Sequence, residues 1–326
     1  MPRLARPFGY TILIALLILA LLIPAAEGLA RLSWIEARIP AAVGAPNPYF
    51  DTKVGELDTL IAQEGRIDCL FIGSSVVNSG IVPARFEKAY YEATGQAIRC
   101  YNFAIPGVTA SGVAKLADLL VERYRPRVLI YGFTLRAFSA EMAQTGGAGQ
   151  IFKADWTRYS TGDWNLHGWI IDHSLAYRRY LALRDWPEAD FVNPVGKRDV
   201  RHYRGFNPFG AGAQFFAPDY LFDYEIAPEE WDALLRLLAL NTQTQVMLVE
   251  MPLPEQTVAV FEGGPTHYAR YLDEVAAAAA EHSIPYIATF GIDIVPDNGW
   301  AGDTHHMSAT GALVFSAWLG EQMGEQ

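Results

Sequence analysis

Two short stretches at opposite ends of the chain carry side chains that can do acyl-transfer chemistry together. Ser74 and Ser75 follow Gly73, directly after a short apolar run. Far along the sequence, Asp303 lies three residues before His306 on a predicted loop. An aspartate at this spacing can orient a histidine and fix its tautomer, and the histidine can then serve as base to a serine. Together these residues indicate nucleophilic catalysis by a serine.

Each stretch alone has a simpler interpretation. Gly-Ser-Ser is common turn chemistry, and a serine at this place can do no more than cap the helix that follows. The stretch around Asp303 can be a capped loop with exposed polar side chains, and His305 competes with His306 for the role of base. The occurrence of both stretches in one chain favours the catalytic interpretation.

The residues between these stretches alternate between predicted strands and helices. Strands are predicted around the apolar run 70–72 and at residues 97–103, 127–131, 245–250 and 284–290, and helices at 53–64, 83–94, 111–124, 228–240, 266–282 and 308–322. Such alternation is typical of a parallel sheet with helices on both faces. Catalytic groups of open parallel sheets collect at the carboxyl ends of the strands. The serines follow the first strand and Asp303 follows the last, so we expect them at one rim of the sheet.

The sequence resembles the SGNH (GDSL-type) hydrolase superfamily in its first and last motifs. The matching residues are Gly73, Ser74 and Ser75 for the family's Gly-Asp-Ser, and Asp303, His306 and Gly311 for its Asp-x-x-His with a glycine five positions on. The resemblance spans residues 67–322. It implies that Ser75 is the nucleophile, that His306 is the base and that Asp303 orients His306. The aspartate of the first motif is replaced by Ser74 in this chain.

The resemblance also implies the fold. The family has a flavodoxin-like three-layer α/β sandwich whose five-stranded parallel sheet has the strand order 2-1-3-4-5. Residues 136–224 interrupt this pattern with an aromatic-rich insertion after strand three, in which one helix is predicted at 169–183. An otherwise irregular segment of this length is unusual inside a compact domain, so we expect the insertion to cover something.

The oxyanion site is the part of the resemblance that departs from the family. The family's glycine after strand two corresponds to Gly107, so the N–H groups of Ser75 and Gly107 are implied as oxyanion donors. The family's Gly-x-Asn after strand three ends in Thr134 here, so the asparagine donor is missing. Thr134 could donate instead, or Asn78 or Asn102 could substitute. Loss of one such donor costs on the order of a hundredfold or more in rate.

The N-terminus predicts a membrane segment. Residues 8–26 carry no charge and are mostly Ile, Leu and Ala, close to the roughly 20 residues that cross a bilayer. Arg3 and Arg6 precede them, whereas charges of both signs follow, which favours an N-terminus inside. We therefore predict an anchor over residues 1–30, with a cleaved signal peptide as the alternative. Residues 31–66 are interpreted as a membrane-proximal connector, and 67–326 as an extracytoplasmic domain, periplasmic or extracellular.

Composition excludes several other classes of function. The formal net charge of -11 argues against nucleic-acid binding, which needs a basic face. The chain has only two cysteines, Cys69 and Cys100, which offer no metal-binding spacing. They are interpreted as buried free thiols, with a disulfide as the alternative in an oxidising compartment.

A flavin-binding domain is disfavoured because the turn after the first strand is short, and the lysine of a phosphate-binding loop is missing. No cofactor and no metal are predicted.

These expectations favour an exported serine esterase or O-acyltransferase. Its substrate would be an acyl ester of a cell-envelope glycan, polymer or lipid, because a Gly-Ser-Ser motif behind an N-terminal anchor is similar to exported SGNH proteins that handle acyl groups on envelope polymers. The competing hypothesis is a catalytically weak or inactive SGNH-like module. The missing asparagine and the anchor motivate it, and it would bind an envelope polymer or a membrane acyltransferase partner.

Overall fold

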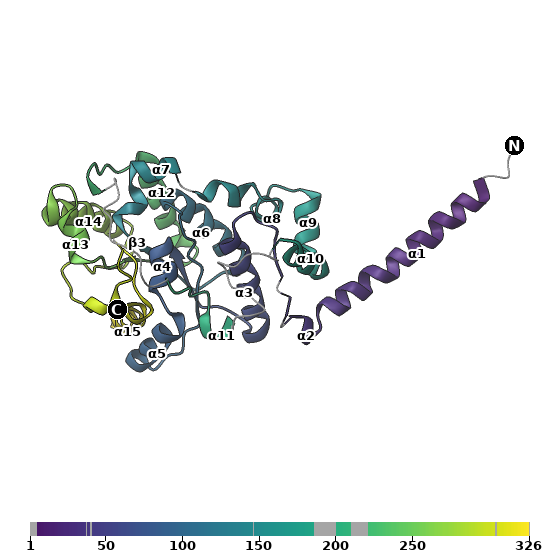
Figure 1. The fold of residues 1–326 in the computed structure, drawn as a ribbon, viewed down its shortest axis with the longest axis horizontal. Coiled ribbons are helices and arrows are strands. Elements are labelled where there is room, and N and C mark those ends of the chain that lie inside the picture. The colour runs from purple at the N-terminus through teal and green to yellow at the C-terminus, as the bar shows by residue number, and fades with distance from the viewer. Residues whose placement is uncertain are drawn as a thin grey trace. The chain divides into compact units, whose positions relative to one another are not determined.

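The structure is a computed structural model of the chain. The residues that it describes are 5–36, 38–39, 41–145, 147–185, 200–209, 221–303 and 305–325. Contacts divide the chain into two compact units, Met1–Gly55 with Ala154–Arg198, and Glu56–Lys153 with Asp199–Gln326. The second unit contains the sheet and both predicted catalytic stretches. Figure 1 shows the chain as a ribbon coloured from the N-terminus to the C-terminus.

Five parallel strands form the sheet of the second unit, in the order β2-β1-β3-β4-β5. Their bounds are β1 (Cys69–Gly73), β2 (Cys100–Asn102), β3 (Val128–Phe133), β4 (Gln245–Glu250) and β5 (Tyr286–Ile287). The strands are buried on both faces, which explains why they are apolar along nearly their whole length. This is the sheet that the SGNH resemblance implies, so the predicted fold class is confirmed.

The two outer strands are shorter than predicted. The sequence predicts strands over 97–103 and 284–290, whereas β2 has three residues and β5 has two. Each outer strand pairs with one neighbour only. The flanking residues Ile98, Phe103 and Ile284 are buried without belonging to the paired segments. Because these residues are buried, the apolar sequence pattern continues past the ends of β2 and β5, which is why the predicted strands are too long.

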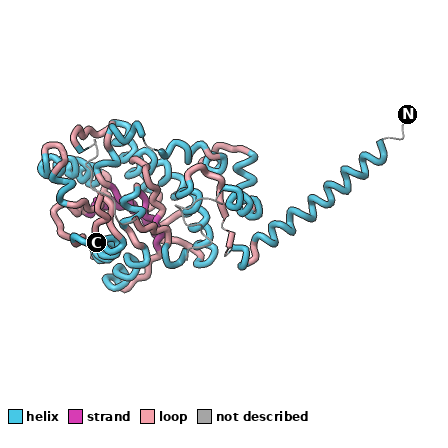
Figure 2. The backbone as a smooth tube through the Cα atoms, viewed as in Figure 1, coloured by secondary structure: helices cyan, strands magenta, loops and turns pink. Residues whose placement is uncertain are grey.

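Helices cover both faces of the sheet, as Figure 2 shows for the body of the molecule. Their bounds are α5 (Pro83–Thr94), α6 (Ala110–Tyr124), α12 (Pro228–Ala239), α14 (Gly264–Glu281) and α15 (Ala309–Gly324), with the short elements α4 (Ser75–Gly80), α13 (Glu255–Ala259), η5 (Leu240–Thr242) and η6 (Asp297–Gly299). α5 packs on α15, and both belong to a core cluster with Phe71 and Ile130 of the sheet. α6 packs on α12. Right-handed crossovers place α6, α12 and α14 on the opposite face.

The segment after β3 is mostly helical where it is described. Its elements are η1 (Leu135–Phe138), α7 (Ala140–Thr145), η2 (Gly147–Lys153), α8 (Asp155–Ser160), α9 (Leu166–His173), α10 (Leu175–Asp185) and α11 (Val200–Tyr203). The single helix predicted at 169–183 is therefore wrong. Ser174 is extended, with φ -117° and ψ 106°, and separates α9 from α10. Residues 186–199 and 210–220 of the predicted insertion lie outside the described residues.

The first unit joins the N-terminal residues to part of this insertion. It contains α1 (Ala5–Ala30), α2 (Ser33–Glu36), the start of α3 (Pro48–Glu64), α8, α9 and α10. Two buried arginines of α10 hold the chain that follows α1. Arg179 Nε donates to the carbonyl of Ala30 at 2.7 Å, and Arg178 Nε donates to that of Ala42 at 3.2 Å. The N-terminal connector is thus folded onto the insertion, a pairing that nothing in the sequence predicts.

α1 is the helix that corresponds to the predicted anchor. Its segment Gly9–Ala30 has 22 residues with a hydropathy of 2.6, and none of its most apolar window is buried. Among the described residues it is the one helix long and apolar enough to cross a membrane, a test that a signal sequence near the N-terminus also passes. Arg3 lies outside the described residues.

The two cysteines are register partners in neighbouring strands. Cys69 of β1 lies opposite Cys100 of β2, and both are buried free thiols. Burial and the neighbouring Cys69 thiol raise the pKa of Cys100 well above its ordinary value. The interpretation as free thiols is confirmed for this structure.

Candidate active site

Ser75 lies just beyond the carboxyl end of β1, as the first residue of α4. Gly73 ends the strand with φ 151°, and a Cβ added there would lie 2.4 Å from the carbonyl oxygen of Gly132 in β3. Only glycine allows this backbone angle and this approach. Ser75 is half-buried. The turn therefore places Ser75 just past the end of β1, which pairs with β2 and β3 at the point where the strand order reverses and open α/β sheets form their ligand crevice.

Asp303 and His306 form a buried pair at the same edge of the sheet. Oδ2 of Asp303 lies 2.5 Å from Nδ1 of His306, and Oδ1 accepts hydrogen bonds from the backbone N–H groups of His305 at 3.0 Å and His306 at 2.7 Å. Burial by itself would raise the pKa of the Asp303 carboxyl, but these hydrogen bonds, first among them that from the His306 side chain, hold it well below its usual range. An ionised Asp303 fixes the proton of His306 on Nδ1.

The loop that carries this pair is tied to the start of α15. Ala301 N–H donates to the carbonyl of His306 at 2.9 Å, and the Ser308 hydroxyl accepts from the N–H of Gly311 at 3.4 Å as an N-cap. A Cβ on Gly311 would lie 2.0 Å from the carbonyl oxygen of Gly299. The glycine five positions after His306 is thus required by packing between α15 and the preceding loop.

The second nitrogen of His306 is the atom that a catalytic base would use. Nε2 is buried and has no hydrogen-bond partner among the described residues. The imidazole lies flat on the ring of Phe209, with centroids 4.0 Å apart and planes inclined by 7°. Phe209 belongs to the predicted insertion, and the sequence analysis did not identify it as a site residue. The expectation that the insertion covers part of the domain was the one indication that a residue of this segment would lie at the site.

α4 lies against both the loop of His306 and the segment of Phe209. A Cβ on Gly80 of α4 would lie 3.6 Å from Cε of Met307, the residue after His306. Asn207 N–H, two residues before Phe209, donates to the carbonyl of Asn78 in α4 at 3.1 Å. The helix that begins at the predicted nucleophile therefore contacts both neighbours of the predicted base.

Ser75 and His306 are placed at one edge of the sheet without a hydrogen bond between them among the described residues, since Nε2 of His306 has no partner. Catalytic hydrogen bonds are often long in unliganded enzymes and tighten when substrate binds. The roles of Ser75, His306 and Asp303 as a triad stay a prediction, whereas the Asp303–His306 pair is a feature of the structure.

Gly107 and Thr134 follow β2 and β3 at the same edge. Gly107 has φ 80° and no heavy atom within 4 Å of an added Cβ. The turn before it is held to β1 by the bond from Ile105 N–H to the carbonyl of Gly73, 2.9 Å long. Thr134 is buried, and its hydroxyl does not cap the η1 turn that follows. The role of both as oxyanion donors stays a prediction.

The two asparagines considered as substitute donors differ in the structure. Nδ2 of Asn102 donates to the carbonyls of Val77 at 2.7 Å and Ile81 at 2.9 Å, and its Oδ1 accepts from Ala104 N–H at 3.1 Å. These bonds hold α4 against β2, so Asn102 serves the fold and does not serve the oxyanion. Asn78 is buried in α4, and its Oδ1 has no partner among the described residues.

His305 is set apart from His306 by its surroundings. Its ring centroid lies 4.1 Å from that of His306, but the Asp303 carboxylate bonds to the ring of His306. Burial, followed by repulsion from His306 and Arg136, lowers the pKa of His305 to about 3. Arg136 is half-buried two residues beyond Thr134 and was not singled out from the sequence. The geometry thus agrees with the choice of His306 over His305.

A metal ion is the alternative use of the same side chains. Asp303, His305 and His306 each offer one ligand atom, all within 4.8 Å of one another. One carboxylate and two imidazoles would suit zinc or iron. However, Oδ2 of Asp303 and Nδ1 of His306 are joined by a hydrogen bond at 2.5 Å, which a metal ion would have to replace. The arrangement is that of a carboxylate orienting a histidine.

A cavity of about 580 Å³ lies at the carboxyl ends of β4 and β5. Glu250 joins two parts of the cavity wall, because Oε2 of Glu250 accepts hydrogen bonds from the N–H groups of Thr289 at 2.9 Å and Phe290 at 3.1 Å. Burial raises the pKa of Glu250. Trp300 lines the cavity and forms a β-bridge with Met307 in the loop of the catalytic pair. The volume is in the range of small-ligand sites.

No protein-family model matches the sequence, and no curated protein matches it. Among solved structures, the chain is similar to a lipase/acylhydrolase from Enterococcus faecalis, with a TM-score of 0.43 and 11% identity over 79% of this chain and 96% of that one. It is also similar to TesA, with a TM-score of 0.41 and 14% identity over 78% of this chain and 98% of that one. At these identities, the chemistry of this chain has to follow from its own residues.

Proposed function

We propose that this protein is a serine esterase or O-acyltransferase of SGNH type that acts on acyl esters. One observation carries the proposal. His306 has its Nδ1 fixed by a buried carboxylate and its Nε2 buried without a partner among the described residues. A buried nitrogen without a hydrogen bond is costly unless a partner arrives with function. A serine hydroxyl at the same edge of the sheet is the natural partner.

The proposed reaction has two steps, acylation of Ser75 and transfer of the acyl group to water or to an alcohol. Ser75 Oγ attacks the carbonyl carbon of the ester while His306 Nε2 takes the hydroxyl proton. The bond to the leaving alcohol then breaks, and His306 gives that alcohol the proton, which leaves an acyl-Ser75 ester. Water or an acceptor alcohol then attacks the acyl carbon while His306 takes its proton. The bond between the acyl carbon and Ser75 Oγ breaks, His306 returns the proton to Oγ, and a carboxylic acid or a new ester is released. Asp303 stays ionised and stabilises the imidazolium in both steps.

Three groups are proposed to hold the negative oxygen of the tetrahedral intermediate. They are the N–H groups of Ser75 and Gly107 and the hydroxyl of Thr134. Each follows a different strand at its carboxyl end, and the strands before Ser75 and Thr134 are paired up to Gly73 and Gly132. A hydroxyl is a weaker and less directed donor than an asparagine amide, so a slow enzyme or one specialised for transfer fits this site.

The substrate is proposed to be an acyl ester on a cell-envelope glycan, polymer or lipid. α1 would anchor the protein with its N-terminus inside, and the second unit would face the periplasm or the exterior. The cavity beside Trp300 has room for one substrate group next to the loop of His306. A membrane acyltransferase is a candidate partner, because an anchored enzyme can receive acyl groups at the membrane surface.

A second candidate is a weak or inactive module that binds an envelope polymer or such a partner. The observation in its favour is that Ser75 and His306 share no hydrogen bond among the described residues. The family's asparagine donor is also replaced by Thr134. Both candidates use the same edge of the sheet and differ in whether Ser75 becomes acylated.

Labelling with a fluorophosphonate probe separates the two candidates. The full chain in detergent should form a covalent adduct that mass spectrometry locates on Ser75, and Ser75→Ala should abolish it. Ser74→Ala is the matched control, because it removes the neighbouring hydroxyl and should keep the label. A folded wild-type chain that takes no label would favour the binding module, and labelling that survives Ser75→Ala would reject Ser75 as nucleophile.

A further inference from the structure

The C-terminal end of α1 is built into the fold of the first unit. The Glu27 carboxylate accepts hydrogen bonds from the hydroxyl of Ser174 and from the backbone N–H groups of Leu175 and Ala176, the latter two at 3.2 Å. These donors lie at the N-terminus of α10, where N–H groups lack partners within the helix. Arg179 of α10 also bonds the carbonyl of Ala30. α1 is therefore held at its last turn and cannot act as a free tether.

This attachment fixes where the first unit meets a bilayer. The apolar segment Gly9–Ala30 ends within one turn of Glu27. With α1 as the proposed anchor, the hydrocarbon boundary would fall close to the start of α10. Trp169 precedes Ser174 by five residues, about 8 Å along a helix. The headgroup layer of a bilayer is about 5–8 Å thick on each side. Trp169 thus lies within reach of that layer.

One face of α9 carries exposed apolar and aromatic side chains close to the end of α1. Leu166, Trp169 and His173 share one face at helical spacing, with Leu166 59% and Trp169 43% exposed. Trp169 stacks on His173 with centroids 4.8 Å apart. Trp164, in the loop before α9, is 70% exposed. Exposed tryptophans beside a membrane helix are typical of the bilayer interface, where an apolar ring with one polar N–H is stable.

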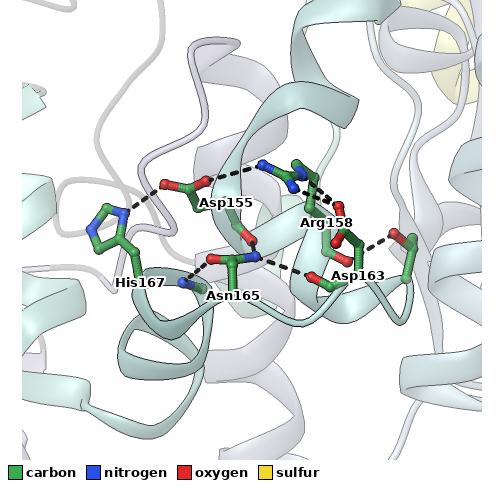
Figure 3. A network of polar contacts seen from close by, with 7 residues as sticks. Asp155, Arg158, Asp163, Asn165 and His167 are labelled. Carbon is green, nitrogen blue, oxygen red and sulfur yellow. Dashed lines mark hydrogen bonds and ion pairs between the residues drawn. The ribbon is translucent and has the colours of Figure 1, made fainter.

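A polar network makes the loop of Trp164 rigid (Figure 3). Asn165 caps α9 by accepting from Gly168 N–H at 2.6 Å, and its Nδ2 donates to the carbonyl of Asp155 at 3.0 Å. Nδ1 of His167 lies 2.8 Å from Oδ2 of Asp155.

Arg158 completes this network on the other side of the loop (Figure 3). Its Nη2 lies 2.6 Å from the Asp163 carboxylate, and its Nη1 lies 3.8 Å from that of Asp155. The acidic groups next to Trp164 are therefore paired, which lowers the cost of moving them close to lipid. An exposed tryptophan on a loop ordered in this way is positioned for contact at little further entropic cost.

We propose that α9 and its preceding loop dock on the bilayer surface, with Trp164 and Trp169 in the headgroup layer beside α1. The first unit is then a membrane-interface module that holds α1, and lipid is its partner. This inference rests on the proposed anchoring by α1 and is independent of the catalytic part of the proposed function. It assigns the exposed aromatics of the insertion to lipid contact.

Quenching of tryptophan emission by lipid tests the proposal. The full chain is reconstituted into phosphatidylcholine vesicles whose acyl chains carry bromine near the glycerol end, and the quenched emission is compared with that in unbrominated vesicles. Trp164→Phe with Trp169→Phe should remove most of the quenched emission that remains in a Trp34→Phe background. Trp231→Phe, in the second unit, is the matched control and should leave the quenched emission unchanged.

Trp34, exposed just beyond α1, separates this proposal from the anchoring itself. Loss of quenching on Trp34→Phe in an otherwise wild-type chain reports that α1 is inserted. If Trp34 is quenched but the double variant loses nothing, α1 is inserted and α9 does not touch lipid, which overturns this inference alone. If no tryptophan is quenched, the anchoring fails and this inference fails with it.

Discussion

The imidazole of His306 lies parallel to the ring of Phe209, with a centroid distance of 4.0 Å. Phe209 comes from the segment after β3 and His306 from the loop after β5, so the contact joins two parts of the second unit that are far apart in sequence. The ring covers one face of the imidazole while Asp303 holds its Nδ1 edge. Phe209 thus limits the orientations of His306 and keeps water from one of its faces.

Removal of this ring should weaken catalysis without abolishing it. We expect Phe209→Ala to lower kcat on a chromogenic acetyl ester by about tenfold, less than the roughly 10²–10⁴-fold that a general base supplies. Phe209→Tyr keeps the stacked ring and should retain near wild-type kcat. An unchanged kcat with a lower KM in Phe209→Ala would show instead that the ring obstructs substrate.

The Thr134 hydroxyl should matter for rate and hardly for fold. Thr134→Val keeps the shape of the buried side chain and removes the donor, so kcat should fall by about tenfold to a hundredfold, toward the cost of one lost oxyanion donor. Thr134→Ser keeps the hydroxyl and should retain most of the rate. Equal kcat values for the valine and serine variants, each folded by circular dichroism, would remove Thr134 from the oxyanion site.

His305 should make the protein less stable in mild acid. Its pKa is lowered to about 3 in the folded chain, whereas an unfolded histidine titrates near 6.5. Between these values the unfolded chain binds more protons, so the free energy of unfolding falls as the pH is lowered from about 6.5 toward 3. His305→Gln should therefore show a smaller loss of stability between pH 7 and pH 4 in urea unfolding. The same loss in variant and wild type would contradict the prediction.

Gly73 should be intolerant of a side chain. Gly73→Ala combines an unfavourable backbone angle, worth about 1–3 kcal/mol, with a clash against the carbonyl of Gly132 that adds a similar cost. Gly95→Ala is the matched control, since Gly95 also has positive φ, 70°, but no atom lies within 4 Å of an added Cβ. Urea unfolding should show the larger loss for Gly73→Ala. Equal losses would mean that β1 and β3 separate easily at this turn.

Much of the second unit follows from local pattern. Buried strands between amphipathic helices, a glycine turn before Ser75 and the Asp303–His306 spacing are all short-range features, and each is set by residues within a few positions of one another. The strand order was implied by the resemblance alone, and the structure has that order. The lengths of β2 and β5 were overestimated because burial, which sets the apolar pattern, continues past the ends of these strands.

Other features depend on contacts that leave no local trace. Asn102 and Thr134 are both polar residues at a strand end, yet only the packing of α4 on β2 shows that Asn102 is used by the fold. Phe209 is one of 17 phenylalanines, and nothing near it in sequence marks it as the partner of His306.

The amino-acid sequence by itself determined the class of fold, the apolar N-terminal helix and the aspartate–histidine pair, because these arise from periodicity and short spacing. Only the tertiary structure decided that residues 154–185 fold with the N-terminal residues and that Glu27 caps α10. Such contacts join residues more than a hundred positions apart. Their free energy depends on complementary shape and on buried hydrogen bonds formed after folding, neither of which a local pattern records.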